Sequence, residues 1–145
     1  GKLKISTYFN FRYDYDIVNG TKMNTTAMYN FDNQSTATLR RWRKEGDVTD
    51  MPRAVIGGGY NWLGSDRYVE DASFLRLRNL NLGYSIPASL VQKTKLIKGA
   101  RVVVQGQNLL TWTKWRGLDP ENNSVYGRFQ YPNTRTYTAG LNVNF

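Results

Sequence analysis

Side chains that perform covalent chemistry or hold tight metal sites are scarce in this sequence of 145 residues. It contains no histidine and no cysteine, which excludes a histidine-based catalytic triad, a thiol nucleophile and a Cys/His zinc site. The acidic cluster Asp66, Glu70 and Asp71 is the remaining place for acid/base chemistry, but carboxylates around a loop more often serve as caps and salt-bridge partners. We therefore predict that the chain is not an enzyme and needs no cofactor.

Two loop motifs resemble ligand sites without completing them. Asp119, Glu121 and Asn122 offer the oxygen ligands that calcium prefers, yet their spacing is incomplete for a calcium loop. Residues 57–59 are three glycines with no Lys-Ser/Thr after them, so they lack the residues of a phosphate-binding loop. We expect solvated loops at both places and no metal site.

Positive charge is the strongest feature of the composition. The sequence has 20 Lys and Arg against 11 Asp and Glu, a net charge of +9, and a pI of about 9.9, which would suit a nucleic-acid surface. The basic residues are dispersed, however, and the two local groups are Arg40, Arg41, Arg43 and Lys44, and Lys93, Lys95 and Lys98. We predict no nucleic-acid partner. The first group suits lipopolysaccharide phosphates or an acidic protein partner, and most of the charge is solvated surface.

Aromatic side chains in the polar loops are the candidates for binding cargo or a partner protein. Flat rings stack on sugar faces, and they also anchor protein interfaces. For any one of them, contact with a partner or packing within the loop is a commoner role than contact with a sugar. The six candidates are Tyr60, Trp62, Trp115, Tyr126, Phe129 and Tyr131.

Strands position these residues. In residues 134–145 apolar and polar side chains alternate strictly, and residues 3–17 and 101–113 repeat the pattern, although Asn108 interrupts the last row. Because successive strand side chains point to opposite faces, each strand has one face toward apolar surroundings and one toward water. Within 74–86 the apolar row moves from odd to even positions, which predicts a bulge near Arg78 and Asn79.

Two architectures fit such strands: a membrane β-barrel wall and a soluble β-sandwich, for example a carbohydrate-binding module. No apolar stretch approaches the roughly 20 residues of a membrane helix, and a mean hydropathy of −0.58 suits a wall in which every second residue faces water. Residues 3–17 are long for a soluble strand, whereas a barrel strand needs about 9–11 residues to cross. We predict an all-β fold made of the last four antiparallel strands of a large transmembrane barrel, with a targeting segment upstream.

The barrel orientation assigns the connections. Barrel termini lie on the periplasmic side, so residues 20–73 and 114–133 become extracellular loops, 87–100 a periplasmic turn and 134–145 the terminal strand. We expect a short helix near 35–44 and one helical turn after Pro87. The alternation turns a set of polar residues into the lumen near the outer end, to bind cargo or, more commonly, to pair structurally: Arg12, Asp14, Asp16, Arg76 and Arg78.

The terminal strand also resembles a known signal. The spacing of Thr138, Gly140, Val143 and Phe145 is similar to the carboxyl-terminal pattern that bacterial outer-membrane barrels present to their assembly machinery. We therefore expect that machinery to be a partner, and localisation as a multi-pass β-barrel in the outer membrane.

Three longer segments resemble one family, the SusC/RagA-like TonB-dependent outer-membrane transporters of Bacteroidota. Residues 65–87 read SDRYVEDASFLRLRNLNLGYSIP, residues 42–53 read WRKEGDVTDMPR, and residues 106–121 read GQNLLTWTKWRGLDPE. Together with Tyr131, Pro132 and 135–138 they cover most of the chain from Trp42 onward, whereas 3–30 matches only in type.

The resemblance implies a barrel of about 22 strands with a separate plug domain. It implies a SusD-like lipoprotein that closes over the outer mouth as a lid, and a TonB complex that acts through the plug, which lies outside these residues. The cargo it implies is an oligosaccharide or an oligopeptide. The segment itself would supply barrel wall, loops and assembly signal. The alternatives are the soluble carbohydrate-binding sandwich and a receptor in which transport is accessory to signalling.

Overall fold

A computed structural model describes residues 2–29, 31–58, 64–121, 124, 126–127 and 131–145. Its internal contacts divide the chain into two units. The first unit combines Gly1–Tyr13, Ser73–Lys114 and Pro132–Phe145, and the second combines Asp14–Ala72 and Trp115–Tyr131. The long alternating strands therefore fall in one unit and most of the two long connections in the other.

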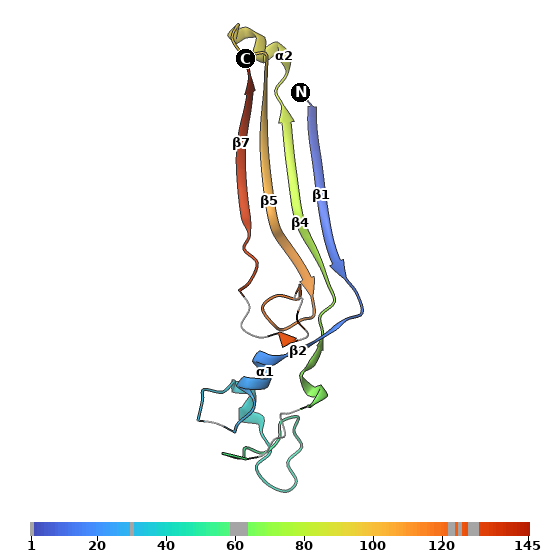
Figure 1. Cartoon of the computed structure of the whole chain (residues 1–145), viewed down its shortest axis with the longest axis vertical. Coiled ribbons are helices and arrows are strands. Elements are labelled where there is room, and N and C mark those ends of the chain that lie inside the picture. Colours follow the sequence, from blue (N-terminus) through green and yellow to red (C-terminus); the bar gives the residue numbers. More distant parts are fainter. Residues whose placement is uncertain (1, 30, 59–63, 122–123, 125, 128–130) are drawn as a thin grey trace. The chain divides into compact units, whose positions relative to one another are not determined.

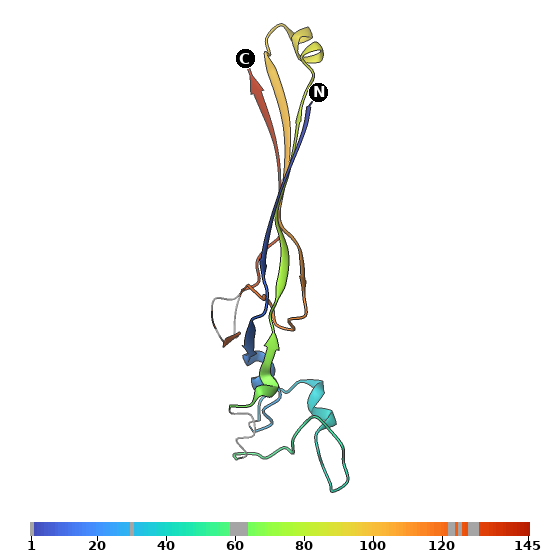
Figure 2. The same cartoon turned by 90° about the vertical axis from the view of Figure 1, so that its right-hand side faces the viewer.

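The first unit is a four-stranded antiparallel sheet in the order β1-β4-β5-β7 (Figure 1). Its strands are β1 (Lys2–Arg12), β4 (Phe74–Ser85), β5 (Gly99–Thr113) and β7 (Thr136–Asn144). Seen along its edge, the sheet is a single twisted layer (Figure 2), as the handed twist of strands requires. Pro87 precedes the helix α2 (Ala88–Val91) and the 3-10 turn η3 (Gln92–Thr94), which link β4 to β5, so the helical turn predicted there is confirmed.

The register gives this sheet one apolar face and one polar face. Leu3 pairs with Tyr84, Tyr84 with Val102 and Val102 with Leu141, so one apolar row crosses all four strands. These side chains are exposed, with 64% of Leu3 and 62% of Leu141 accessible. The predicted alternation is confirmed, and within the described residues no second sheet covers the apolar face. The apolar face carries Leu3, Ile5, Phe9, Phe11, Leu75, Leu77, Leu80, Leu82, Tyr84, Val102, Val104, Leu110, Trp112, Tyr137, Ala139 and Leu141.

The predicted bulge lies at Arg78. Tyr8 and Phe9 of β1 pair with Asn79 and Leu77, so β4 has one extra residue there. In β5 the partners of Leu77 and Asn79 are Leu110 and Gln107, so two residues, Asn108 and Leu109, lie opposite Arg78. One extra residue reverses the facing of a strand, whereas two restore it. This explains why the apolar row changes phase in β4 but is only interrupted in β5, where Asn108 has a φ of +52°.

The first strand is shorter than predicted. The expectation of a strand over 3–17 is wrong, because β1 ends at Arg12 and Asp14 has a left-handed φ of +58°. An extended strand cannot continue through that conformation, which Asp tolerates better than most residues. Asp16 instead begins β2 (Asp16–Asn19) of the second unit.

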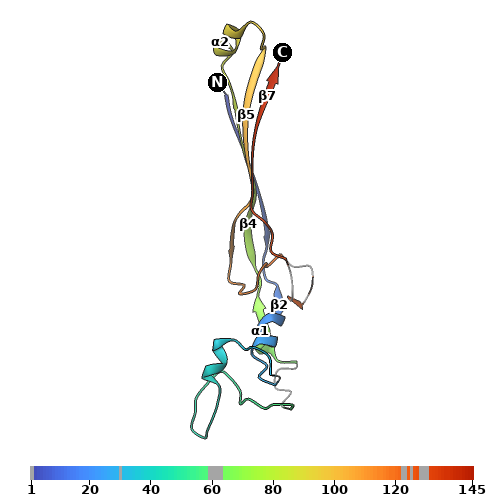
Figure 3. The ribbon, with the colours of Figure 1, turned by 90° about the vertical axis from the view of Figure 1, so that its left-hand side faces the viewer.

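The second unit contains a small three-stranded sheet that the sequence pattern did not predict. β2 pairs antiparallel with β3 (Val69–Asp71) and parallel with β6 (Tyr126–Gly127). β2 leads directly into α1 (Gly20–Thr25) (Figure 3). Asn19 caps α1, since its Oδ1 accepts a hydrogen bond of 2.9 Å from the Lys22 backbone N–H.

Two 3-10 turns complete the second unit. The helix predicted near 35–44 is confirmed as the shorter turn η1 (Thr36–Arg40), whose cap Ser35 accepts a hydrogen bond from Ala37. Ser65 caps η2 (Asp66–Tyr68) in the same way through Arg67. Polar residues of this long connection therefore cap the starts of short helical turns. None of the described helices is long and apolar enough to cross a membrane.

The second unit has a packed core. Ile17, Ala72 and Trp115 are buried together, and Tyr15 packs against them. Tyr15 is fixed at both ends, because its carbonyl accepts from the Ala72 N–H at 3.0 Å and its hydroxyl donates to the Pro120 carbonyl. The core thus joins residues from both long connections.

Candidate functional site

The structure separates the five polar residues predicted to face the lumen. Arg12 and Arg76 lie on the polar face of the sheet, in adjacent rows, and Arg78 lies at the bulge. Asp14 and Asp16 belong to the second unit, so their expected place on the first strand is wrong. The strand ends before them because of the left-handed backbone at Asp14.

Arg76 is the most enclosed of these side chains, with only 3% of its surface exposed. Its Nε donates a hydrogen bond of 3.0 Å to Thr111 Oγ1 on the neighbouring strand. Its guanidinium carbon also lies 5.6 Å from the centre of the Phe74 ring, within the range of a cation–π contact. Arg76 therefore joins β4 to β5, which is the structural pairing expected as the commoner role for this set.

The aromatic candidates differ in how exposed their rings are. Trp115 is 7% exposed and belongs to the core. A methyl group on Gly117 would collide with its indole, and one on Gly127 would lie 2.9 Å from its Cζ2, so the ring is held between two glycines. The structure therefore gives Trp115 a packing role and not the open face that stacking on cargo requires. Tyr131 is 89% exposed, as a binding ring should be.

The remaining aromatic candidates are only partly located. The backbone of Tyr126 lies in β6, and Tyr60, Trp62 and Phe129 lie outside the described residues. Binding by Tyr131 and by these four residues stays a prediction.

The four residues of the predicted assembly signal lie in or just beyond β7. Thr138 pairs with Gln105 and Gly140 with Val103, on the polar face, whereas Val143 pairs with Ala100. Phe145 follows the strand and is exposed. Their recognition by assembly machinery stays a prediction.

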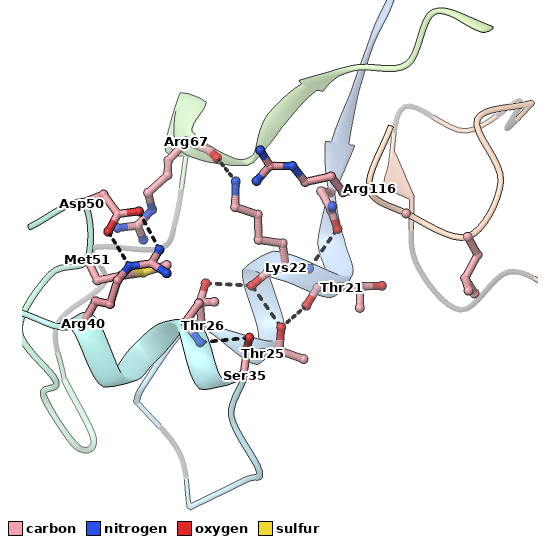
Figure 4. Close-up of a pocket in the computed structure, with 14 residues that line it drawn as sticks. Thr21, Lys22, Thr25, Thr26, Ser35, Arg40, Asp50, Met51, Arg67 and Arg116 are labelled. Atoms are coloured by element: carbon pink, nitrogen blue, oxygen red, sulfur yellow. Dashed lines mark hydrogen bonds and ion pairs between the residues drawn. The ribbon is translucent and has the colours of Figure 1, made fainter. Parts of the chain in front are cut away.

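The second unit contains a cavity of about 510 Å³ that is open on one side to the surroundings (Figure 4). Its walls come from α1, from η1 and the loop after it, from η2 and from residues 116–118. Four cationic side chains line it, together with hydroxyl groups and a few apolar side chains. The lining residues are Asn19, Thr21, Lys22, Thr25, Thr26, Ser35, Ala37, Arg40, Asp50, Met51, Arg67, Arg116, Gly117 and Leu118.

On one side of the cavity, Lys22 forms a partly buried ion pair with Glu70. Its Nζ lies 2.9 Å from Glu70 Oε1 and donates a second hydrogen bond of 2.9 Å to the Arg67 carbonyl. Asn19 donates to the other carboxylate oxygen at 3.1 Å. Burial alone would raise the pKa of Glu70, but the hydrogen bonds from Lys22 and Asn19 and the charges of Lys22 and Arg116 outweigh it, so the pKa is lowered.

Elsewhere in the lining, Arg40 forms a bidentate, solvent-exposed ion pair with Asp50. The Arg40 Nη2 lies 2.9 Å from Asp50 Oδ2, and its Nε lies 3.3 Å from Oδ1. The hydrogen bond from Arg40 is the main cause of the lowered pKa of Asp50, and the charge of Arg67 adds a smaller effect in the same direction. Both walls of the cavity therefore hold ionised groups at neutral pH.

The acidic residues that first suggested chemistry have structural roles. Glu70 is a salt-bridge partner, as expected for its cluster. Asp119 accepts a hydrogen bond of 2.8 Å from the Glu121 backbone N–H, which closes a turn, and within the described part of the chain no group of three acidic residues could hold a metal ion.

Sequence reasoning missed Lys22, Arg67 and Arg116 as members of one site. The sequence did contain a signal for Lys22: Asn19 is a residue type that often caps a helix start, and a helix beginning at Gly20 places Lys22 in the first turn of α1. Nothing in local spacing indicates that residues 22, 67 and 116 meet, because β2, β3 and the core bring them together from distant parts of the chain.

Comparison with known proteins finds sequence relatives that are each named a TonB-dependent receptor. TonB-dependent receptor P3 of Formosa agariphila is 38% identical over 125 residues, which cover 78% of this chain and 12% of that receptor. TonB-dependent receptor P26 of the same organism is 37% identical over 119 residues, 72% of this chain and 12% of the receptor. TonB-dependent receptor SusC of Bacteroides thetaiotaomicron is 38% identical over 81 residues, 56% of this chain and 8% of SusC. No family model matches the chain.

Solved structures agree in fold and in sequence. The RagAB peptide importer in its closed-closed state aligns with a TM-score of 0.85 and 33% identity over 99% of this chain and 16% of that chain. A second RagAB peptide transporter structure gives 0.83 and 34%, with the same coverage. The chain thus spans about an eighth of the length of the two Formosa relatives, and the matched proteins are receptors and importers rather than enzymes. The chain is a SusC/RagA-like section of the β-barrel of a TonB-dependent transporter.

Proposed function

We propose that the protein to which this chain belongs imports oligosaccharides or oligopeptides across the bacterial outer membrane. In this proposal β1, β4, β5 and β7 are the closing strands of a barrel of about 22 strands, residues 20–73 and 114–133 belong to extracellular loops, and residues 87–100 form a periplasmic turn. The proposed partners are a SusD-like lipoprotein lid, the TonB complex acting through a plug, the outer-membrane assembly machinery and lipopolysaccharide.

The two-faced sheet carries this proposal. A single layer with a continuous exposed apolar face and a polar opposite face is stable where hydrocarbon covers one side and water the other. Its matches to TonB-dependent receptors and to a peptide importer support transport as the use of such a wall. Each outer strand of the sheet has one edge without a strand partner among the described residues, and neighbouring strands of a barrel would pair with those edges.

The absence of a second layer among the described residues argues against the soluble sandwich. A sandwich buries its apolar row against another sheet, whereas here large side chains such as Phe11 and Trp112 are at least half exposed. We therefore keep the barrel as the one proposed setting for this chain.

The test begins with the native protein, extracted from outer membranes in detergent and run on a gel both unboiled and boiled. We expect a species far heavier than 16.7 kDa whose mobility changes on heating and which co-purifies with a lipoprotein. Uptake of labelled oligosaccharides and oligopeptides by cells is then compared before and after removal of that lipoprotein or of TonB. A water-soluble species of 16.7 kDa, or uptake that survives both deletions, would contradict the proposal.

A further inference from the structure

We propose that the cavity of the second unit binds a carboxylate group of the cargo: the terminal carboxylate of an oligopeptide or the uronate of an acidic oligosaccharide. This inference rests on the proposed import function and deepens it, because it names the charge of the cargo. Three observations support it: an excess of cations in the cavity wall, a buried guanidinium nitrogen that lacks an acceptor among the described residues, and a lining of hydroxyl groups and apolar side chains.

The charges of the cavity do not balance. Its four cations are Lys22, Arg40, Arg67 and Arg116. Glu70 neutralises Lys22 and Asp50 neutralises Arg40, whereas Arg67 and Arg116 form no salt bridge among the described residues. The lining therefore holds four cations and one carboxylate, Asp50, while Glu70 pairs with Lys22 from outside the lining. An anion in the cavity would meet two guanidinium groups, those of Arg67 and Arg116, that form no salt bridge among the described residues.

Arg67 is fixed in place while one of its hydrogen-bond donors, Nε, stays unpaired among the described residues. Its guanidinium carbon lies 4.8 Å from the centre of the Tyr68 ring, and its Nη2 donates to the Tyr68 hydroxyl. Its Nε is buried and has no hydrogen-bond partner among the described residues. A buried donor without an acceptor is costly, and guanidinium groups pair best with planar oxyanions such as carboxylates. Arg67 thus lines the cavity as a stacked guanidinium that still has an unpaired donor.

The rest of the lining suits the body of such a cargo. The hydroxyls of Thr25 and Thr26 already donate to the carbonyls of Thr21 and Lys22, at 2.9 and 2.7 Å. Their oxygens can still accept hydrogen bonds from a peptide N–H or a sugar O–H. Met51, Ala37 and Leu118 add an apolar surface. A cavity of about 510 Å³ has the size of ordinary small-molecule sites.

The experiment is isothermal titration of the full-length transporter, purified in detergent with its partner lipoprotein. The peptide probes are N-acetyl-tetraalanine as the free acid and as its carboxyl-terminal amide. The sugar probes are trigalacturonate and its methyl ester. Each pair differs in charge but little in shape. The titrations are repeated with Arg67→Gln, Arg116→Gln and the control Lys114→Gln, which removes one exposed charge outside the cavity.

We expect at least one acid to bind about tenfold or more tightly than its neutral counterpart, and each Arg→Gln change to remove about tenfold of that affinity. Lys114→Gln should alter it less than about twofold. Because Arg67 packs on buried Tyr68, exposed Arg116 provides a variant with little risk to folding.

Three outcomes would overturn the inference: equal binding of acid and neutral forms, binding of neither acid, or full acid affinity in both arginine variants. Each of these can occur while the transporter remains in the outer membrane and imports other cargo. Failure of the anion site is therefore distinguishable from failure of the import proposal. Preference for the peptide acid or for the uronate identifies which source of carboxylate the cavity accepts.

Discussion

The two units of this chain are stabilised in opposite ways. The sheet of β1, β4, β5 and β7 exposes its largest apolar side chains, so its stability depends on surroundings that the chain does not provide. The second unit, by contrast, buries Ile17, Tyr68, Ala72 and Trp115 among its own residues. One unit is a wall with an exposed apolar face, and the other is a small body with its own core.

This contrast shows that exposure and burial have different meanings for the same residue type. Trp112 and Trp115 are three positions apart, yet Trp112 is half exposed on the apolar face and Trp115 is buried between glycines. Their roles follow from the unit to which each belongs. Substitutions that act in one unit and not in the other are therefore the sharpest tests.

The largest effect is expected from Trp115→Ala. Removing the indole from the core leaves a cavity, and such changes cost about 3–5 kcal/mol. Hydrogen exchange of full-length transporter should become faster in residues 14–29 and 64–72 and stay unchanged in β4 and β5. Tyr131→Ala, at an exposed ring, is the control and should leave exchange unaltered. Equal protection in the two variants would mean that Trp115 is not a core residue.

A second, somewhat smaller effect is expected when a charge is placed on either face of the sheet. Val104 and Gln105 are neighbours in β5 that point to opposite faces. Arginine at position 104 would face hydrocarbon and cost about 2–4 kcal/mol near the membrane centre, whereas arginine at 105 would face water. We expect Val104→Arg to lower the amount of heat-modifiable protein in outer membranes and Gln105→Arg to leave it near normal. Equal levels would contradict the assignment of the two faces.

The smallest effect concerns the two ion pairs of the second unit. The pKa of Glu70 is lowered in the folded state, so its contribution to stability is present above its ordinary value of 4.5 and is lost as the pH falls below that value. The protection factors for hydrogen exchange near β2 and β3, which correct for the intrinsic effect of pH on the exchange rate, should therefore decrease below that pH. Glu70→Gln should remove this pH-dependent loss of protection and cost about 1–2 kcal/mol at neutral pH.

Asp50→Asn provides the matched comparison for Glu70. Its pair with Arg40 is exposed on both sides, with 61% and 64% of the side chains accessible, and such pairs add little to stability. We expect no measurable change in exchange for this variant. A loss as large as that of Glu70→Gln would show that burial does not distinguish the two pairs.

Most of the sheet could be predicted from sequence because its information is local. An alternation of period two shows directly which face of the sheet each side chain occupies. The shift of the apolar row from odd to even positions near Arg78 is sufficient to locate the bulge. The end of β1 could not be located, because a single left-handed residue at Asp14 leaves no mark on the apolar pattern.

The second unit was much less predictable because its order is not local. β2, β3 and β6 are at most four residues long, too short for a period to emerge. The cavity depends on Lys22, Arg67 and Arg116, which come from three separate segments. Trp115 shows the same limit, since an indole in a polar loop gives no sign of whether it is exposed or held between distant glycines.

The bulge around Arg78 grows from strand to strand, and this limits how strands can be exchanged between barrels by protein engineering. The number of extra residues rises from none in β1 to one in β4 and two in β5. A β4 without Arg78 would still alternate regularly against β1, but it would face two unmatched residues of β5. Consider a chimaera that takes β4 alone from a protein with a different number of extra residues. That β4 could pair in register with one of its two neighbouring strands but not with the other. Adjacent strands of this wall should accordingly be transplanted together, as a block that keeps the steps between neighbours.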